Sequence, residues 1–258
     1  MSSIEFQLSN QVAYITLNRP DKLNSFNREM AMLLQQRLDD CSTDKSIRAV
    51  VITGSGKAFS AGQDLGEVTD PDGQGMKRIL AEHFNPIVQK IRNLTKPVIA
   101  AVNGVAAGAG ANIALCCDIV IASASASFIQ AFSKIGLIPD SGGTFLLPRL
   151  IGFQKASAIM MLGDKITAIE AERIGMIYKC VEEEIFKTEI ERIATALSIM
   201  PTKALAFTKQ ALNASISNDL QTQLDYEDQL QQRAAATIDF KEGVTAFIEK
   251  RIPNFKGE

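Results

Sequence analysis

Asp140 is the acidic residue of this sequence whose surroundings best suit proton transfer. It lies in the stretch KIGLIPDSGG, close to apolar residues such as Ile138 and Phe145. Apolar surroundings disfavour a charged carboxylate and raise its pKa towards the range in which the group exchanges protons near neutral pH. An aspartate just before a Gly-Gly helix start is also, and more commonly, an N-cap. The residues alone leave both interpretations open.

Two turns rich in glycine and alanine could present main-chain N–H groups to a ligand. The first covers residues 58–65 (AFSAGQDL), and the second covers residues 103–112 (NGVAAGAGAN) and opens a helix that runs to about Cys117. Small residues permit close approach to the backbone, and the first N–H groups of a helix have no intrahelical partner. Two such groups aimed at one point would form an oxyanion hole. Tight packing of strand against helix explains the same composition, and an Asx hydrogen bond suffices to explain Asp64.

Composition and charge limit the fold class and the kinds of function that this sequence can have. The chain has 258 residues, of which 46% are hydrophobic and 22% charged, and a formal net charge of −2. This size and composition fit one large α/β domain, and the balanced charge argues against nucleic acid as a partner. Four cysteines without CxxC spacing favour a reducing compartment. The single histidine, His83, is interpreted as an ordinary helix residue, which leaves little for a metal site or a Ser-His-Asp triad.

Several common motifs are absent from the sequence. Residues 54–57 (GSGK) lack the spacing of a phosphate-binding loop, and residues 108–113 (GAGANI) lack the last small residue of a dinucleotide-binding turn. Neither Ser60 nor Ser141 lies in GxSxG, so a serine hydrolase is disfavoured.

Hydrophobic periodicity predicts strands that alternate with helices, which indicates a partly parallel sheet. The predicted strands are 4–9, 12–18, 49–53 and 98–102. The predicted helices are 24–41, with Asn27 as N-cap, and 76–93, 168–175, 184–200, 202–215 and 219–236, followed by a short tail. Residues 66–75 (GEVTDPDGQG) are expected to form a mobile loop. The nearly uncharged stretch 97–128 is better explained by buried strands and a helix than by a membrane span. With no leader-like N-terminus, we expect a cytoplasmic protein without a membrane partner.

Four motifs together resemble the enoyl-CoA hydratase/isomerase (crotonase) superfamily. They are LNRPDKLNSFN, AFSAGQDL, KPVIAAVNGVAAGAGANIALCCDIVIAS and FIQAFSKIGLIPDSGGTFLLPRLIG, and the resemblance covers essentially the whole chain. Within the superfamily, AFSKIGLIPDSGG and the ending EGVTAFIEKRIPNFKG are most similar to isomerases of aerobic phenylacetate breakdown, which convert ring-1,2-epoxyphenylacetyl-CoA to its oxepin.

The resemblance implies an α/β crotonase-like ββα spiral over residues 1–200 and a C-terminal helical trimerisation region over residues 201–258. It implies an acyl-CoA substrate, a homotrimer or dimer of trimers, and no metal or cofactor apart from the coenzyme A of the substrate. Gln63 and Ala109 would donate backbone N–H groups to the thioester oxygen. The implied substrate-binding residues are Lys22, Leu23, Ala58, Ser60, Ala61, Asp64, Leu65 and Gly110.

The two glutamates with which the hydratases hold water align with Asn112 and Phe132, and Asp140 stands where isomerases of this subgroup carry their acid/base. The resemblance therefore implies an acyl-CoA isomerase with Asp140 as the single acid/base. Besides converting the ring epoxide to its oxepin, this enzyme could also shift a 3,4 double bond of an enoyl-CoA to the 2,3 position. Three alternatives stay open: an enoyl-CoA hydratase, a dehalogenase-like enzyme with Asp140 as nucleophile, and a non-catalytic acyl-CoA-binding scaffold. The acyl group is undefined, and its pocket wall is expected from residues 76–86 and 131–137.

Overall fold

The chain begins with a hairpin of two antiparallel strands, β1 (Ile4–Ser9) and β2 (Val12–Leu17). The computed structural model describes residues 2–69 and 75–258. Asn10 and Gln11, which join the two strands, both have positive φ, 49° and 65°. Two central residues with positive φ match the twist of a two-residue hairpin, so the predicted hairpin is confirmed with a tight turn.

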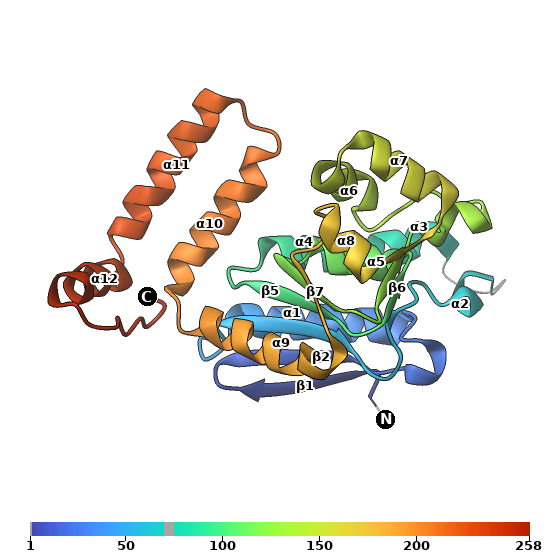
Figure 1. Cartoon of the computed structure of the whole chain (residues 1–258), viewed down its shortest axis with the longest axis horizontal. Helices are drawn as coiled ribbons and strands as arrows, with labels where there is room; N and C mark the ends of the chain where they lie inside the picture. The colour runs from blue at the N-terminus through green and yellow to red at the C-terminus, as the bar shows by residue number, and fades with distance from the viewer. Residues whose placement is uncertain (1, 70–74) are drawn as a thin grey trace.

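A six-stranded sheet continues from this hairpin in the order β1-β2-β3-β5-β7-β10 (Figure 1). Its remaining strands are β3 (Ala49–Gly54), β5 (Val98–Val102), β7 (Ile119–Ser123) and β10 (Lys179–Val181). All pairs after the hairpin are parallel. Every residue of β5 is buried, as expected for a parallel strand covered on both faces.

Alternate residues of these strands enter two hydrophobic clusters on opposite faces of the sheet. One face packs under α1 (Arg28–Thr43) and α4 (Asn85–Asn93), and the other packs under α9 (Glu183–Ser198). The smaller cluster, under α9, contains Val12, Ala49, Val51, Ile99, Ala101, Ile121, Val181, Ile190, Ile193 and Ala194. Successive residues of a strand point to opposite faces of the sheet, so the same strands contribute side chains to both hydrophobic layers.

A second, four-stranded sheet runs in the order β4-β6-β8-β9. Its strands are β4 (Ala58–Ser60), β6 (Val105–Ala107), β8 (Ser127–Ile129) and β9 (Lys165–Thr167). Each of β3, β5 and β7 passes into a short strand of this sheet and then into a helical segment. The repetition of strand, strand and helix confirms the predicted ββα spiral, and it brings the chain after β4, β6 and β8 to one region.

The predicted helices are largely confirmed, with changes at two places. Asn27 caps α1, since its side chain accepts a hydrogen bond from the N–H of Met30 at 3.0 Å. Residues 75–93 are helical throughout but contain a π-helix, η2 (Ile79–Phe84), between α3 (Gly75–Arg78) and α4. The predicted loop 66–75 is wrong in part because Leu65–Thr69 forms helix α2, while residues 70–74 lie outside the described residues.

Helices over the second sheet and beyond it complete the described chain. They are α5 (Ala109–Cys116), η3 (Ala131–Ile135), α6 (Gly143–Ile151), α7 (Phe153–Leu162), α8 (Ala168–Arg173), α10 (Thr202–Ser215), α11 (Leu220–Ala235) and α12 (Ile238–Glu249), besides the short η1 (Pro20–Lys22). Helix α12 corrects the prediction that only a short tail follows α11.

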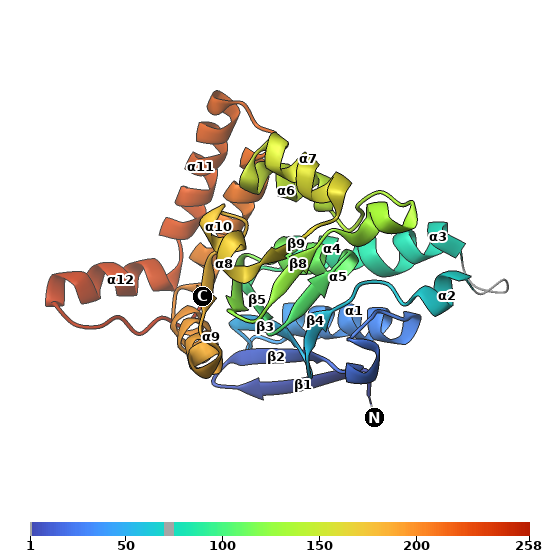
Figure 2. The same ribbon diagram turned by 45° about the vertical axis from the view of Figure 1, so that its right-hand side comes forward.

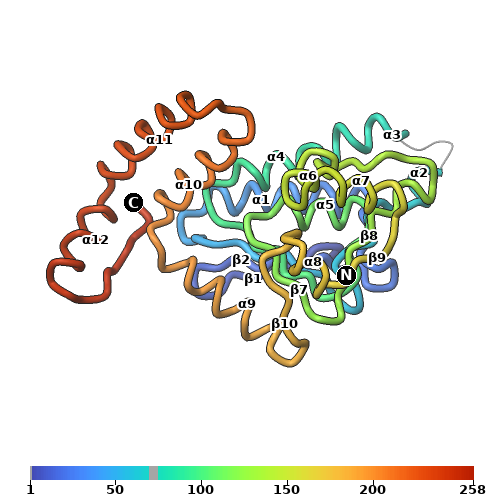
Figure 3. Tube along the Cα trace, turned by 45° about the horizontal axis from the view of Figure 1, so that its top comes forward, coloured from blue at the N-terminus to red at the C-terminus, as the bar shows by residue number. Residues whose placement is uncertain are grey.

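Helices α10 to α12 extend away from the two sheets as an arm (Figures 2 and 3). The final segment returns to the arm, where buried Asp239 accepts hydrogen bonds from the N–H groups of Lys256 and Gly257 at 2.6 and 2.7 Å. Large apolar side chains on the arm are exposed, among them Leu212, Phe247 and Ile248. The division at residue 200 and the trimerising role stay predictions.

The nearly uncharged stretch 97–128 forms β5, β6, α5, β7 and β8 inside the core. In the described ranges, no helix combines the length and the apolar character that a bilayer span requires.

Candidate active site

A cavity of about 370 Å³ opens where the chain leaves β4, β6 and β8. Its walls come from α2, α3, η2, η3 and the start of α5, and they are mainly apolar. The residues that line it are Lys22, Ser25, Ala61, Gln63, Asp64, Leu65, Val68, Met76, Ile79, Phe84, Gly108, Ala109, Ala131, Phe132, Lys134, Ile135, Leu137 and Asp140. The wall expected from residues 76–86 and 131–137 is therefore present.

Asp140 is half-buried in this cavity, on the turn before α6. The hydroxyl of Ser141 donates a hydrogen bond to Asp140 Oδ1 at 2.9 Å. Burial raises the pKa of the Asp140 carboxyl above its ordinary value, and the hydrogen bond from Ser141 opposes that rise. The N-cap position of α6 is held by Gly142, at φ 77°, with no side-chain cap. Asp140 is thus not the helix cap that is the more common role in such a sequence context, and its carboxylate is left for the cavity.

The two small-residue turns meet at the cavity. A Cβ added to Gly62 would lie 2.9 Å from the oxygen of Ala107 and 3.1 Å from the nitrogen of Ala109. Gly62 also has φ 89°, a conformation that a side chain rarely adopts. The predicted donors Gln63 and Ala109 both line the cavity, so the glycine permits their close approach.

The N–H groups of Gln63 and Ala109 have no acceptor within the described part of the chain. Phe26 donates to Gly62 O at 2.7 Å and accepts from the Asp64 N–H at 2.9 Å, so the main chain of Gln63 between them faces the other way. Ala109 is the first residue of α5, whose N–H has no intrahelical partner. The positive end of the helix dipole favours negative charge at this point.

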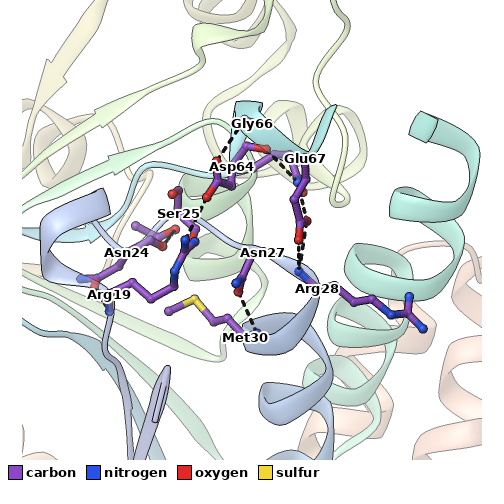
Figure 4. A network of polar contacts seen from close by, with 11 residues as sticks. Arg19, Asn24, Ser25, Asn27, Arg28, Met30, Asp64, Gly66 and Glu67 are labelled. Carbon is purple, nitrogen blue, oxygen red and sulfur yellow. Dashed lines mark hydrogen bonds and ion pairs between the residues drawn. The ribbon is translucent and has the colours of Figure 1, made fainter. Parts of the chain in front are cut away.

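Polar contacts join Asp64 and Glu67, at the end of the first turn and in α2, to Arg19 and to the start of α1 (Figure 4). Glu67 accepts two hydrogen bonds from the N–H of Arg28, at 2.9 and 3.0 Å. Asp64 forms an ion pair with Arg19 at 2.9 Å and accepts from the N–H of Gly66 at 3.0 Å. The Asx hydrogen bond expected of Asp64 is therefore present, and its carboxylate is held by a cation.

Of the predicted substrate-binding residues, Lys22, Ala61, Asp64 and Leu65 line the cavity. Leu23 is exposed beside Lys22 but does not line it.

Ala58, Ser60 and Gly110 are buried and are not among the residues that line the cavity, and their contacts with substrate stay a prediction. The Ser60 hydroxyl donates to Asn24 O at 2.8 Å and accepts from the Gly62 N–H at 3.1 Å. A Cβ on Gly110 would lie 2.5 Å from Ser60 O. Ser60 and Gly110 are small where β4 and α5 touch, which is the packing explanation that the composition left open.

The two positions aligned with hydratase glutamates hold no carboxylate. Phe132 lines the cavity, and Asn112 is fully buried behind Asp140. Asp140 is the one carboxylate among the described lining residues that has no cation within ion-pair distance, since Asp64 is paired with Arg19.

His83 and three of the four cysteines are buried, and Cys180 is partly exposed. His83 lies in η2, 1% exposed, and burial lowers its pKa. Cys116 and Cys117 are buried as expected, and burial raises the pKa of Cys116 to about 12.

Gln130 and Glu67 were not singled out in the sequence, and Ser141 was considered there only as a hydrolase nucleophile. The contacts of Gln130 and Glu67 join segments that are distant in the chain, and the contact of Ser141 depends on the conformation of one turn.

Known proteins resemble this chain in both sequence and fold. The family model described as enoyl-CoA hydratase/isomerase matches residues 7–258. The chain is 46% identical to the 1,2-epoxyphenylacetyl-CoA isomerase of Escherichia coli K12, with 99% of this chain and 100% of that protein covered. It is 44% identical to a protein of Rhodobacter capsulatus described as a probable enoyl-CoA hydratase, with 99% and 98% covered. The crystal structure of an enoyl-CoA hydratase from Bacillus anthracis matches with TM-score 0.92 and 34% identity, covering 99% of this chain and 100% of that one.

Proposed function

The chain belongs to the enoyl-CoA hydratase/isomerase family, and on that premise we propose that it is an acyl-CoA isomerase with Asp140 as its single acid/base. One observation carries the proposal. The half-buried Asp140 carboxylate shares a cavity with the unpartnered N–H groups of Gln63 and Ala109, and no second unpaired carboxylate lines that cavity among the described residues.

The reaction begins at the carbon next to the thioester carbonyl. Asp140 removes a proton from C2 of a 3-enoyl thioester, and the electron pair moves into the carbonyl to give a dienolate. The N–H groups of Gln63 and Ala109 stabilise the oxygen on which the charge grows. Asp140 then returns the proton to C4, which leaves the double bond between C2 and C3. Loss of one such donor typically costs about 2.7–4 kcal/mol, roughly a hundredfold to a thousandfold in rate.

The burial of Asp140 suits this cycle. A base that must later act as an acid works best when its pKa lies near the working pH, and burial raises the Asp140 pKa in that direction. Conversion of ring-1,2-epoxyphenylacetyl-CoA to its oxepin is also an isomerisation, so a proton taken from the methylene between thioester and ring must be returned. We propose this epoxide as the preferred substrate because of the similarity to the E. coli enzyme.

Coenzyme A enters beside the first turn. Lys22 lines the cavity, is exposed, and supplies a positive charge for a phosphate of the coenzyme A portion of the substrate. The adenine and pantetheine portions pass Leu23 and Ala61. The exposed apolar side chains of α10–α12 need cover, and we propose a homotrimer or a dimer of trimers built on this arm.

Hydration is the second candidate function, because one relative is described as a probable hydratase. Hydration requires a water molecule oriented between two acid/base groups. Asn112 and Phe132 supply neither, and Asp64 is paired with Arg19.

The test is a substrate panel with the purified protein. Ring-1,2-epoxyphenylacetyl-CoA and a 3-enoyl-CoA should be isomerised, and a 2-enoyl-CoA should not be hydrated at a comparable rate. Faster hydration than isomerisation would overturn the proposal. An acyl adduct on Asp140, detected by whole-protein mass after substrate trapping, would favour the dehalogenase-like alternative. Binding of acyl-CoA with no turnover of any substrate would leave the non-catalytic scaffold.

A further inference from the structure

Asn112 contacts the turn that carries Asp140 from behind the cavity. Its Nδ2 donates a hydrogen bond to the main-chain oxygen of Asp140 at 2.8 Å. Its Oδ1 accepts a hydrogen bond from Gln130 Nε2 at 2.7 Å. Asn112 is 0% exposed, Gln130 is 1% exposed, and neither lines the cavity. An effect of either residue on the reaction must therefore pass through another group.

The amide of Asn112 also fixes the far end of the same turn. A Cβ added to Gly143 would lie 2.3 Å from Asn112 Nδ2, so α6 begins in direct contact with this amide. One turn of α5 further on, Cys116 Sγ lies 3.4 Å from the main-chain oxygen of Ser141. The turn 140–143 is thus held against one face of α5 along its length.

The same helix carries the predicted oxyanion donor. Ala109 and Asn112 are three residues apart and lie on the same face of α5. A helix turn is rigid, so α5 itself fixes the distance between the Ala109 N–H and Asn112, whose side-chain amide holds the main chain of Asp140. Proton transfer depends on that distance, because the base must reach a carbon whose carbonyl oxygen is bound at Ala109.

Gln130 determines which way the Asn112 amide points. Because Asn112 Nδ2 donates to Asp140 O, its oxygen must face Gln130, which therefore presents its own Nε2. Gln130 Oε1 is then buried without a hydrogen-bond partner among the described residues. An unsatisfied buried acceptor destabilises the folded state, so the arrangement is not the one that stability alone would favour.

We infer that Asn112, oriented by Gln130, is a positioning residue that sets the place of the Asp140 carboxylate relative to the oxyanion hole. This inference rests on the proposed function of Asp140. An ionised aspartate or glutamate at position 112 would only accept hydrogen bonds and could not donate to the Asp140 carbonyl. The amide is therefore the group that this turn requires.

The test measures the coupling between Asn112 and Asp140 in the full-length protein. Asn112→Ala and Gln130→Met are each made in the wild type and in the Asp140→Asn background, and kcat and KM are determined for 3-enoyl-CoA isomerisation. A misplacement of about 1 Å costs about a hundredfold in rate, so kcat of Asn112→Ala should fall to that extent while KM changes little. In the Asp140→Asn background the same substitution should change the residual rate by less than about twofold, because Asn112 acts only through Asp140. Independent effects would instead multiply, and the rate would fall about a hundredfold in this background too. Gln130→Met should lower kcat less and should be non-additive with Asn112→Ala.

Gln35→Ala is the matched control for loss of a buried amide. Gln35 Nε2 donates to the main-chain oxygen of Glu82 at 2.8 Å, a bond of the same kind and length. This variant should lower the melting temperature without coupling to Asp140→Asn. If Asn112→Ala does not fold, the coupling between Gln130→Met and Asp140→Asn tests the inference instead.

Two results would overturn the inference: an equal loss of rate in both backgrounds, or folded variants of Asn112 and Gln130 with normal kcat. Full activity of Asp140→Asn would instead refute the proposed function. The two failures are therefore distinguishable.

Discussion

Substitution of Gly110 tests the oxyanion hole without touching a proposed donor. Gly110 follows Ala109 in α5, and a Cβ at this position would lie 2.5 Å from Ser60 O and 2.7 Å from Ser60 Cβ. Ordinary contacts begin near 3.4 Å, so Gly110→Ala must separate α5 from β4 by about 0.9 Å. Both partners are main chain or short side chains in the core, so no flexible group can move aside instead.

The displacement carries the Ala109 N–H away from the substrate oxygen. A shift of about 1 Å costs about a hundredfold in rate, and complete loss of the donor costs up to about a thousandfold. We therefore expect kcat to fall by about a hundredfold or more. KM should change less, because a donor to the growing negative charge acts mainly in the transition state.

The assay follows 3-enoyl-CoA isomerisation by the absorbance of the conjugated product, with the melting temperature measured in parallel. Gly243→Ala is the matched control, because a Cβ at this helical position meets only the Phe255 ring, at 3.4 Å. Alanine in place of a helical glycine should stabilise the protein by about 0.5–1 kcal/mol and leave kcat unchanged. A folded Gly110→Ala variant with wild-type kcat would refute the reasoning.

Three further predictions concern buried polar groups. Burial raises the pKa of Asp140 in the folded state, so the folded protein binds this proton more tightly than the unfolded chain, and its stability falls as the pH rises from about 3.9 through the raised pKa. In thermal unfolding at pH 7, Asp140→Asn should therefore be more stable than the wild type, and the difference should disappear in acid. A variant that is less stable than the wild type at pH 7 would contradict this. Ser141→Ala removes a hydrogen bond that lowers the Asp140 pKa, so the acidic limb of the kcat/KM profile should move to higher pH, whereas a shift to lower pH would show that the bond plays no such part. Ser127 is 1% exposed and its hydroxyl has no partner among the described residues, so urea unfolding of Ser127→Ala should show a gain of up to about 1 kcal/mol, and a loss above that size would reveal a missing partner.

Much of the fold and part of the site could be predicted from sequence, because local signals carried them. Period-two alternation defined the hairpin, and the apolar run 98–102 defined β5, since neighbours along the chain decide both. Asp140 stood out because its neighbours along the chain are apolar, although Ile138 and Phe145 are themselves exposed and the Asp140 side chain is half-buried in the cavity wall.

The rest depended on contacts between distant segments. The packing of Gly110 against Ser60, fifty positions earlier, could not be predicted from either segment alone. Asn112 was recognised only by its alignment with a hydratase glutamate, while its bond to Asp140 spans 28 residues. Helix α2 was missed because its five residues, with one glycine among them, show no helical period.

The most direct test of the central claim follows a deuterium label through Asp140. A 3-enoyl-CoA carrying deuterium at C2 is converted in ordinary water by the wild type and by Asp140→Asn, and the product is analysed for deuterium at C4. If Asp140 alone moves the proton, the wild type should place part of the label at C4, and the variant should isomerise the substrate at least about a hundredfold more slowly. Isomerisation by Asp140→Asn at the wild-type rate, with the same transfer of label, would contradict the account.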